Sequence, residues 1–197
     1  LISLHVNGPK EGRVNIVFLA EGYTRYQQDR ISKDMNTFFE AIIQFEPLSH
    51  YERFINVYGI WAESPSQGIG GYYGSYQWPD IERLLVADNE LVYNSISELI
   101  PEADIPVVII NSEIYGGSGG EIAVATSGAP EIVAHEIGHS FASLGDEYEY
   151  ETPGQKPMEM PNVTHVTNRA GVKWNYWIQA ATPLPTPEEP FYDQRVG

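Results

Sequence analysis

Residues 122–146 read IAVATSGAPEIVAHEIGHSFASLGD, and this stretch decides the fold. It begins with an apolar run, residues 122–126, that is typical of a β-strand and is expected at the edge of a sheet. Pro130 suits the first turn of a helix, and the residues that follow carry the motif HExxH at positions 135–139. The stretch therefore predicts an edge strand, a short loop and a helix with chemically active side chains.

Helical geometry brings the two histidines of the motif together. His135 and His139 differ by about 40° around the helix axis and by one turn along it, so both imidazoles can point at one metal ion. Glu136 lies about 100° from His135, where its carboxylate can reach a water on the metal without being a ligand, as a general base should. The opposite face is predicted to be an apolar stripe that packs into the core, formed by Val133, Ile137, Phe141 and Leu144. This division into two faces favours a real zinc site over a chance match to the motif.

The motif supplies two ligands, whereas a catalytic zinc ion usually has three protein ligands and a water. Because the chain has no cysteine, the third ligand is expected to be His, Asp or Glu. In a continuous helix Asp146 would lie about 10 Å from His139, much farther than a zinc–oxygen bond of about 2 Å allows. We therefore expect the helix to break and the chain to fold back, with Gly145 adopting a positive φ. Asp146 is the preferred third ligand, and the alternatives are Glu147, Glu149 and His165.

The residues before this stretch alternate between predicted strands and helices. Three apolar runs are predicted as strands: residues 14–19, 54–62 and 106–110. Thr24 and Gln27 form a capping box, and apolar residues at helical spacing continue from there to about Phe45. Two further helices are predicted, near residues 80–86 and 89–100, the second with Asp88 as its N-cap. The alternation indicates an α/β fold with a mixed, twisted sheet.

The balance of charges argues against two classes of partner. The chain has 27 acidic and 11 basic residues, which gives a formal net charge of −16. Such a charge repels phosphate backbones and anionic membrane surfaces, so we expect no nucleic-acid binding. No run of roughly 18 apolar residues is present, so we expect no insertion into a membrane.

Proline becomes frequent near the C-terminus. Seven of the 14 prolines lie after Thr152, a frequency typical of irregular loops. We predict a single catalytic domain over residues 1–197. Its α/β core, residues 1–150, carries the motif helix, and residues 151–197 form a loop-rich and incomplete C-terminal part.

The chain resembles the IgA peptidase family of bacterial zinc metallopeptidases, a branch of the metzincin-like zincins. The likeness extends in order over RVNIVFLAEGYT (13–24), VVIINSEIYGGSGG (107–120), IAVATS (122–127), HEIGHSFASLGDEY (135–148), PNVT (161–164) and KWNYW (173–177). The resemblance implies a zincin catalytic domain with Zn²⁺ held by His135, His139 and Asp146, and with Glu136 as the catalytic base. It also implies a bacterial protein that is secreted, periplasmic or at the cell surface.

These features predict a zinc-dependent endopeptidase that acts on protein or peptide substrates. A water activated by zinc would attack the peptide carbonyl after Glu136 removes its proton. The predicted edge strand, with Ile122, Ala123 and Val124, is expected to pair with the substrate backbone, and Tyr148 is a candidate for stabilising the oxyanion. The alternatives are a catalytically impaired zinc-binding domain that recognises peptide or glycan, a zinc hydrolase of other amides or esters, and an interaction module with structural histidines.

Overall fold

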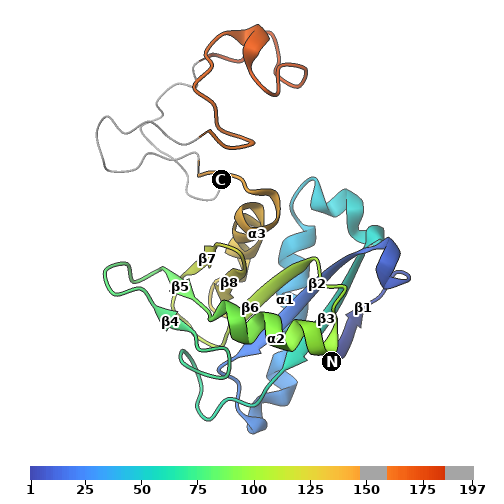
Figure 1. Ribbon diagram of the computed structural model, residues 1–197, viewed down its shortest axis with the longest axis vertical. Helices are drawn as coiled ribbons and strands as arrows, with labels where there is room; N and C mark the ends of the chain where they lie inside the picture. The colour runs from blue at the N-terminus through green and yellow to red at the C-terminus, as the bar shows by residue number, and fades with distance from the viewer. Residues whose placement is uncertain (147–158, 185–197) are drawn as a thin grey trace. The chain divides into compact units, whose positions relative to one another are not determined.

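The computed structural model describes residues 1–146 and 159–184. The chain forms two compact units, Leu1–Phe141 and a second one that begins at Ala142. The first unit holds a six-stranded sheet and the helices that cover it (Figure 1). The candidate metal ligands Glu147 and Glu149 and the candidate oxyanion residue Tyr148 lie outside the described residues.

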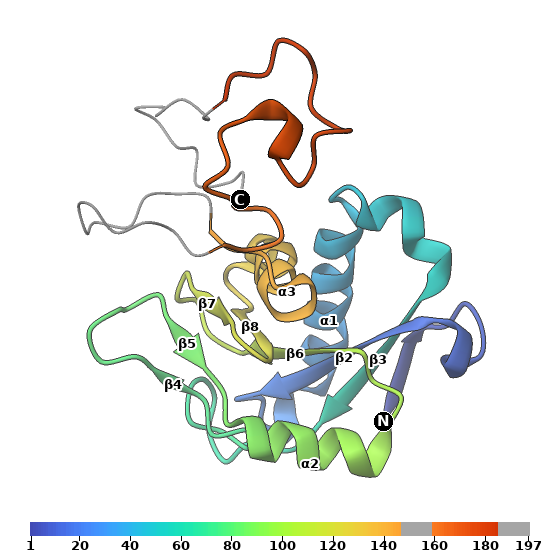
Figure 2. The same cartoon turned by 45° about the horizontal axis from the view of Figure 1, so that its top comes forward.

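The sheet is mixed and has the strand order β1-β3-β2-β6-β8-β7 (Figure 2). Its strands are β1 Ile2–His5, β2 Val14–Glu21, β3 Ile55–Trp61, β6 Ile105–Ile110, β7 Gly117–Gly119 and β8 Ala123–Thr126. The four central strands run parallel, and the outermost strands, β1 and β7, run antiparallel to their neighbours. Two further short strands, β4 Tyr76–Gln77 and β5 Leu85–Val86, pair separately. The expected α/β fold with a mixed sheet is confirmed.

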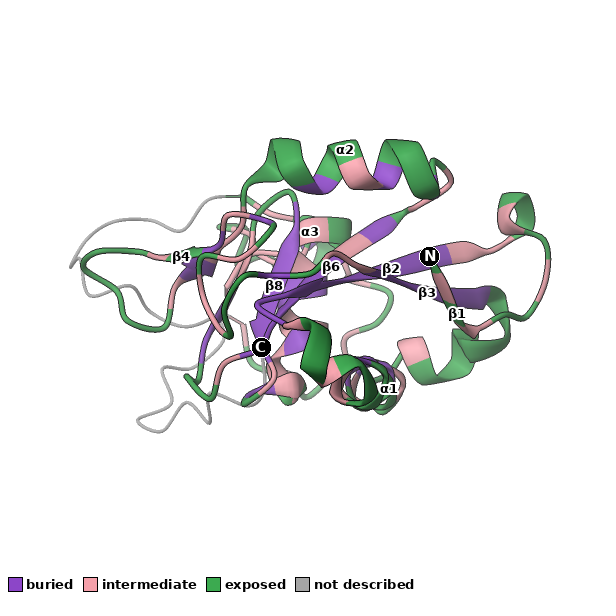
Figure 3. Cartoon of the chain, turned by 90° about the horizontal axis from the view of Figure 1, so that it is seen from below, coloured by how far each residue is buried: buried purple, intermediate pink, exposed green. Residues whose placement is uncertain are grey.

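Helices cover both faces of the sheet. Helix α1 Gln28–Ile43 and helix α3 Val133–Ala142 pack on one face, and α2 Asn89–Leu99 packs on the other (Figure 2). Figure 3 shows α1 and α2 on opposite sides of the sheet. Strand β2 lies at the centre and is buried along nearly its whole length. A strand covered on both faces needs apolar residues at successive positions, which explains the apolar run at residues 16–20.

The connection between β2 and α1 forms as its sequence predicts. Thr24 and Gln27 make the expected capping box, which opens a short 3₁₀ helix ahead of α1. The helix buries Ile31, Met35, Phe38, Phe39 and Ile42 against the sheet. It ends two residues before Phe45, which is exposed. The Asp88 side chain caps α2 as predicted, because it accepts a hydrogen bond from Leu91 N at 3.1 Å.

Two predictions about local structure are wrong. The helix predicted near residues 80–86 is replaced by β5, whose two residues pair with β4. The strand predicted at the sheet edge is β8, and it pairs with β6 on one side and β7 on the other. Its predicted substrate-binding residues Ile122, Ala123 and Val124 are buried, so they do not form an open edge. The strand at this edge is β7, whose sequence is GSG.

Candidate metal centre

Helix α3 carries the HExxH motif, and the burial of its apolar residues in the core determines the orientation of the helix. A short 3₁₀ helix, Pro130–Ile132, precedes it. Val133 and Ile137 are buried in the core that α3 shares with α1. The rest of the predicted apolar stripe does not form. Phe141 is 53% exposed, and Leu144 lies beyond the end of the helix at Ala142.

The two histidines of the motif converge. Their Nε2 atoms lie 3.0 Å apart, and their rings stand at 88° to each other. One ligand atom each of His135, Glu136 and His139 lie within 4.8 Å of one another. Two nitrogens on one tetrahedral zinc ion, with bonds of 2.0–2.1 Å, would be about 3.3 Å apart. The imidazole pair therefore fits a zinc ion with a shift of only a few tenths of an ångström, and the nitrogen and oxygen donors are ones that zinc accepts.

Glu136 lies at the buried side of this group. The residue is 9% exposed. Its Oε1 faces the backbone of β7, since a Cβ added at Gly117 would lie 3.3 Å from it. The carboxylate is thus confined between the helix and the edge strand, close to both imidazoles.

Strand β7 touches α3 directly because its glycines have no side chains. A Cβ at Gly119 would lie 2.6 Å from His139 Cβ and 2.7 Å from Glu136 O. A Cβ at Gly117 would lie 2.9 Å from Ile132 Cδ1 and 2.3 Å from Val124 O. The GSG sequence of β7 is therefore required for close packing of the edge strand on the motif helix. An edge strand thus lies beside the motif helix, but it is β7 and not the predicted residues 122–126.

The outer side of β7 is only partly covered. Gly117 N donates to Arg83 O at 2.9 Å, and the hydroxyl of Ser118 donates to Leu85 O. Backbone groups of an antiparallel strand alternate in direction, so those of Gly119 point to the same outer side as those of Gly117. Gly119 thus offers outward backbone groups beside His139.

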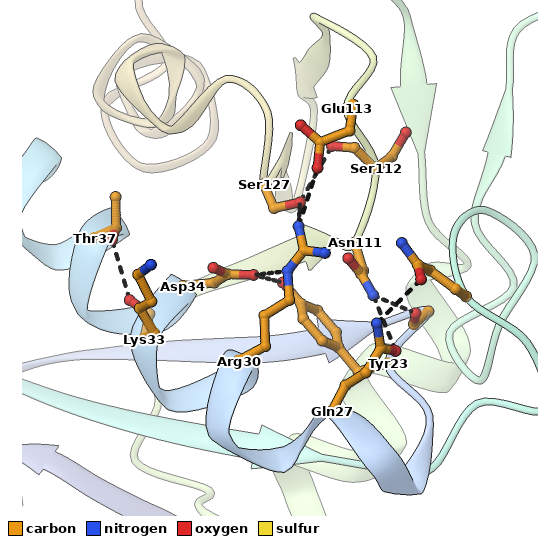
Figure 4. A network of polar contacts seen from close by, with 12 residues as sticks. Tyr23, Gln27, Arg30, Lys33, Asp34, Thr37, Asn111, Ser112, Glu113 and Ser127 are labelled. Atoms are coloured by element: carbon orange, nitrogen blue, oxygen red, sulfur yellow. Dashed lines mark hydrogen bonds and ion pairs between the residues drawn. The ribbon is translucent and has the colours of Figure 1, made fainter.

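A polar network holds the segment that leads into α3 (Figure 4). Arg30, from α1, donates to Glu113 at 3.1 Å and to Ser127 at 3.4 Å, in the loops that follow β6 and β8. Asp34 pairs with Arg30 at 3.2 Å and accepts a hydrogen bond from the Tyr23 hydroxyl at 2.7 Å. Burial, and then the nearby Asp34 carboxylate, raise the pKa of Tyr23 well above its ordinary value, so the hydroxyl remains a donor. The network ties α1 to Ser127, in the loop just before the 3₁₀ helix that precedes α3. The sequence carries no local signal for this network because its members lie far apart in the chain.

In the second unit, the chain turns immediately after α3. Ser143, and not Gly145 as predicted, has the positive φ, at 52°. Gly145 is required for a different reason, because a Cβ there would lie 2.7 Å from Met160 Cγ. The predicted break in the helix is therefore confirmed. Asp146 as third ligand stays a prediction.

The chain matches a known protein family. A family model described as IgA Peptidase M64 matches residues 2–195. No curated protein shows significant similarity to the chain. In the part of the chain that the structure describes, no helix is long and apolar enough to cross a membrane. The family match covers nearly the whole chain, including the HExxH helix and the edge strand beside it.

Proposed function

The chain belongs to the IgA Peptidase M64 family of metallopeptidases, and from that premise we propose that it is a zinc-dependent endopeptidase with a metzincin-like zincin fold. In this proposal, His135, His139 and Asp146 hold the ion. The observation that carries it is the pair of Nε2 atoms 3.0 Å apart, next to the buried carboxylate of Glu136. We further propose that the protein acts outside the cytoplasm, as a secreted, periplasmic or cell-surface protein, on the strength of the family resemblance.

The proposed chemistry is peptide hydrolysis with Glu136 as the general base. Zinc, when bound, supplies a Lewis acid that polarises the peptide carbonyl and makes water a nucleophile near neutral pH. Glu136 takes the proton from the attacking water and passes a proton to the leaving amine. Its burial between α3 and β7 supports this role, because a confined carboxylate keeps its orientation toward the reacting atoms. His135 and His139 must be neutral to donate their lone pairs to the metal.

The family name implies a protein substrate, and we propose that its backbone pairs with the outer side of β7. The outward amide and carbonyl of Gly119 support this position, since Gly119 packs against His139. An extended peptide that adds to an exposed strand gains affinity from main-chain hydrogen bonds. Because the Arg83–Leu85 segment covers the Gly117 end, the peptide would begin to pair at Gly119.

The test is cleavage of a broad peptide library, followed by mass spectrometry, with zinc content measured on the same samples. The wild type should cleave peptides. Glu136→Gln should retain zinc but lose about 10²–10⁴-fold in rate, the usual contribution of a general base. Glu131→Gln is the matched control, because Glu131 is exposed on the 3₁₀ turn that leads into the same helix. A wild type that holds zinc and binds peptides without cutting any would favour the impaired recognition domain instead.

A further inference from the structure

The side-chain amide of Asn162 binds the backbone of Gly145 twice. Its Oδ1 accepts a hydrogen bond from Gly145 N at 2.7 Å, and its Nδ2 donates to Gly145 O at 2.7 Å. Both distances are at the short end of the range for N–H···O bonds. The carbonyl of Gly145 shares a planar peptide unit with the nitrogen of Asp146. Asn162 therefore sets the orientation of the peptide that carries Asp146.

Asn162 is itself held in a braced turn. Met160 and Val163, on either side of it, exchange two backbone hydrogen bonds of 3.1 Å each. Lys173 Nζ donates to the carbonyls of both residues, at 2.7 and 3.0 Å, and pairs with Glu159 at 2.8 Å. The hydrogen bond from Lys173, with a second one from a backbone amide, lowers the pKa of Glu159 to about 2, so this ion pair is present at neutral pH. These hydrogen bonds and this ion pair stabilise the turn that carries Asn162.

Gly145 lies close to Met160, where a larger residue would not fit. A Cβ at this position would meet Met160 Cγ at 2.7 Å and Met160 Cβ at 3.1 Å. Its φ is not in the positive region, so the glycine is required by the close approach and not by backbone strain. The missing side chain thus allows the Gly145 backbone to lie close to the Met160–Val163 turn, which carries Asn162.

We infer that Asn162 is a positioning residue for the metal centre, which holds the Gly145–Asp146 backbone so that the Asp146 carboxylate is presented in one orientation. This inference rests on the proposed function, in which Asp146 is the third ligand. Partners that orient a metal ligand typically change metal affinity by about 10–100-fold when they are removed. Without Asn162, metal binding would have to order the Asp146 side chain and backbone, and this entropic cost would weaken the affinity for the metal.

The experiment uses the full chain as wild type, Asn162→Ala, Gly145→Ala and Asp146→Ala. The matched control is Asn168→Ala, which removes another side-chain-to-backbone hydrogen bond of the same unit, from Ala170 N at 3.1 Å. Zinc affinity is measured by competition with a chelator. The absorption spectrum of the Co²⁺-substituted protein reports the ligand set, and thermal unfolding of the metal-free protein reports folding.

Asn162→Ala and Gly145→Ala should weaken zinc binding by at least about tenfold. Their Co²⁺ spectra should move toward that of Asp146→Ala, while Asn168→Ala keeps the affinity and spectrum of the wild type. If Asn162→Ala does not fold, the zinc affinity of Gly145→Ala tests the inference instead. That variant keeps the Asn162 carboxamide and disturbs only the approach of the Gly145 backbone.

The outcomes separate the inference from the function on which it rests. Wild-type affinity in both Asn162→Ala and Gly145→Ala, with a loss in Asp146→Ala, would overturn the inference and leave the proposed ligands standing. An equal loss in Asn168→Ala would show that Asn162 has only a general structural role. If Asp146→Ala held zinc like the wild type, the proposed ligand set would be wrong, and the inference with it.

Discussion

Replacing Gly119 by alanine should damage the metal centre although no metal ligand is itself substituted. The new Cβ would lie 2.6 Å from His139 Cβ and 2.7 Å from Glu136 O, whereas ordinary contacts begin near 3.4 Å. The strand and the helix would therefore have to separate by close to 1 Å. Overpacking of this kind costs about 1–3 kcal/mol of stability. A misplacement of about 1 Å at reacting groups costs about 10²-fold in rate, so kcat/KM should fall by about that factor.

Gly120→Ala is the matched control for this prediction. A Cβ at the neighbouring Gly120 meets nothing within 4 Å, and its φ is not positive. The measurements are kcat/KM on a peptide that the wild type cleaves and the free energy of unfolding in urea. Gly120→Ala should match the wild type in both. If Gly119→Ala and Gly120→Ala gave the same rate and stability, direct packing of β7 on the motif helix would be refuted.

Three further predictions concern stability and titration. Glu21 is fully buried and accepts hydrogen bonds from the amides of Gly71, Tyr73 and Ser75. Glu21→Ala should therefore lower the free energy of unfolding in urea by at least about 3 kcal/mol. A loss under about 1 kcal/mol would contradict this. Asp88→Ala should cost about 1 kcal/mol in the same assay, because α2 loses its N-cap, and an unchanged midpoint would disprove the cap's contribution. The pKa of Glu159 is lowered from 4.5 to about 2, so its ion pair contributes fully above pH 4.5 and is lost as the pH falls through about 2. Carboxyl NMR should show a midpoint near 2, and one near 4.5 would contradict the pairing with Lys173.

Local signals in the sequence predicted the parts of the fold that depend on local interactions. The capping box at Thr24 and the helical spacing after it predicted α1, because capping and amphipathic packing act within a few residues. The apolar residues that follow Val14 predicted β2, since a strand buried on both faces carries apolar residues at successive positions. The HExxH spacing likewise predicted that His135 and His139 converge, because residues four apart lie on the same face of a helix.

The parts that were missed depend on tertiary pairing. Strand β7 has the sequence GSG and carries no periodic signal, so only its pairing with β8 makes it a strand. The same holds for β5, whose two residues have no recognisable pattern without β4. Gly119 could not be identified from the sequence as a contact of His139, because nothing local indicates which element packs on a glycine. Arg30 was missed for a related reason, since it joins loops about 80–100 residues away.

Crystallography with anomalous scattering at the zinc absorption edge would show whether the HExxH helix holds a metal ion. The protein would be purified without a histidine tag and crystallised with one equivalent of zinc. The account predicts one strong anomalous peak about 2.0–2.1 Å from the Nε2 atoms of both His135 and His139, with Asp146 as the third protein ligand. Zinc at another position, or the absence of a peak between the two imidazoles, would contradict it.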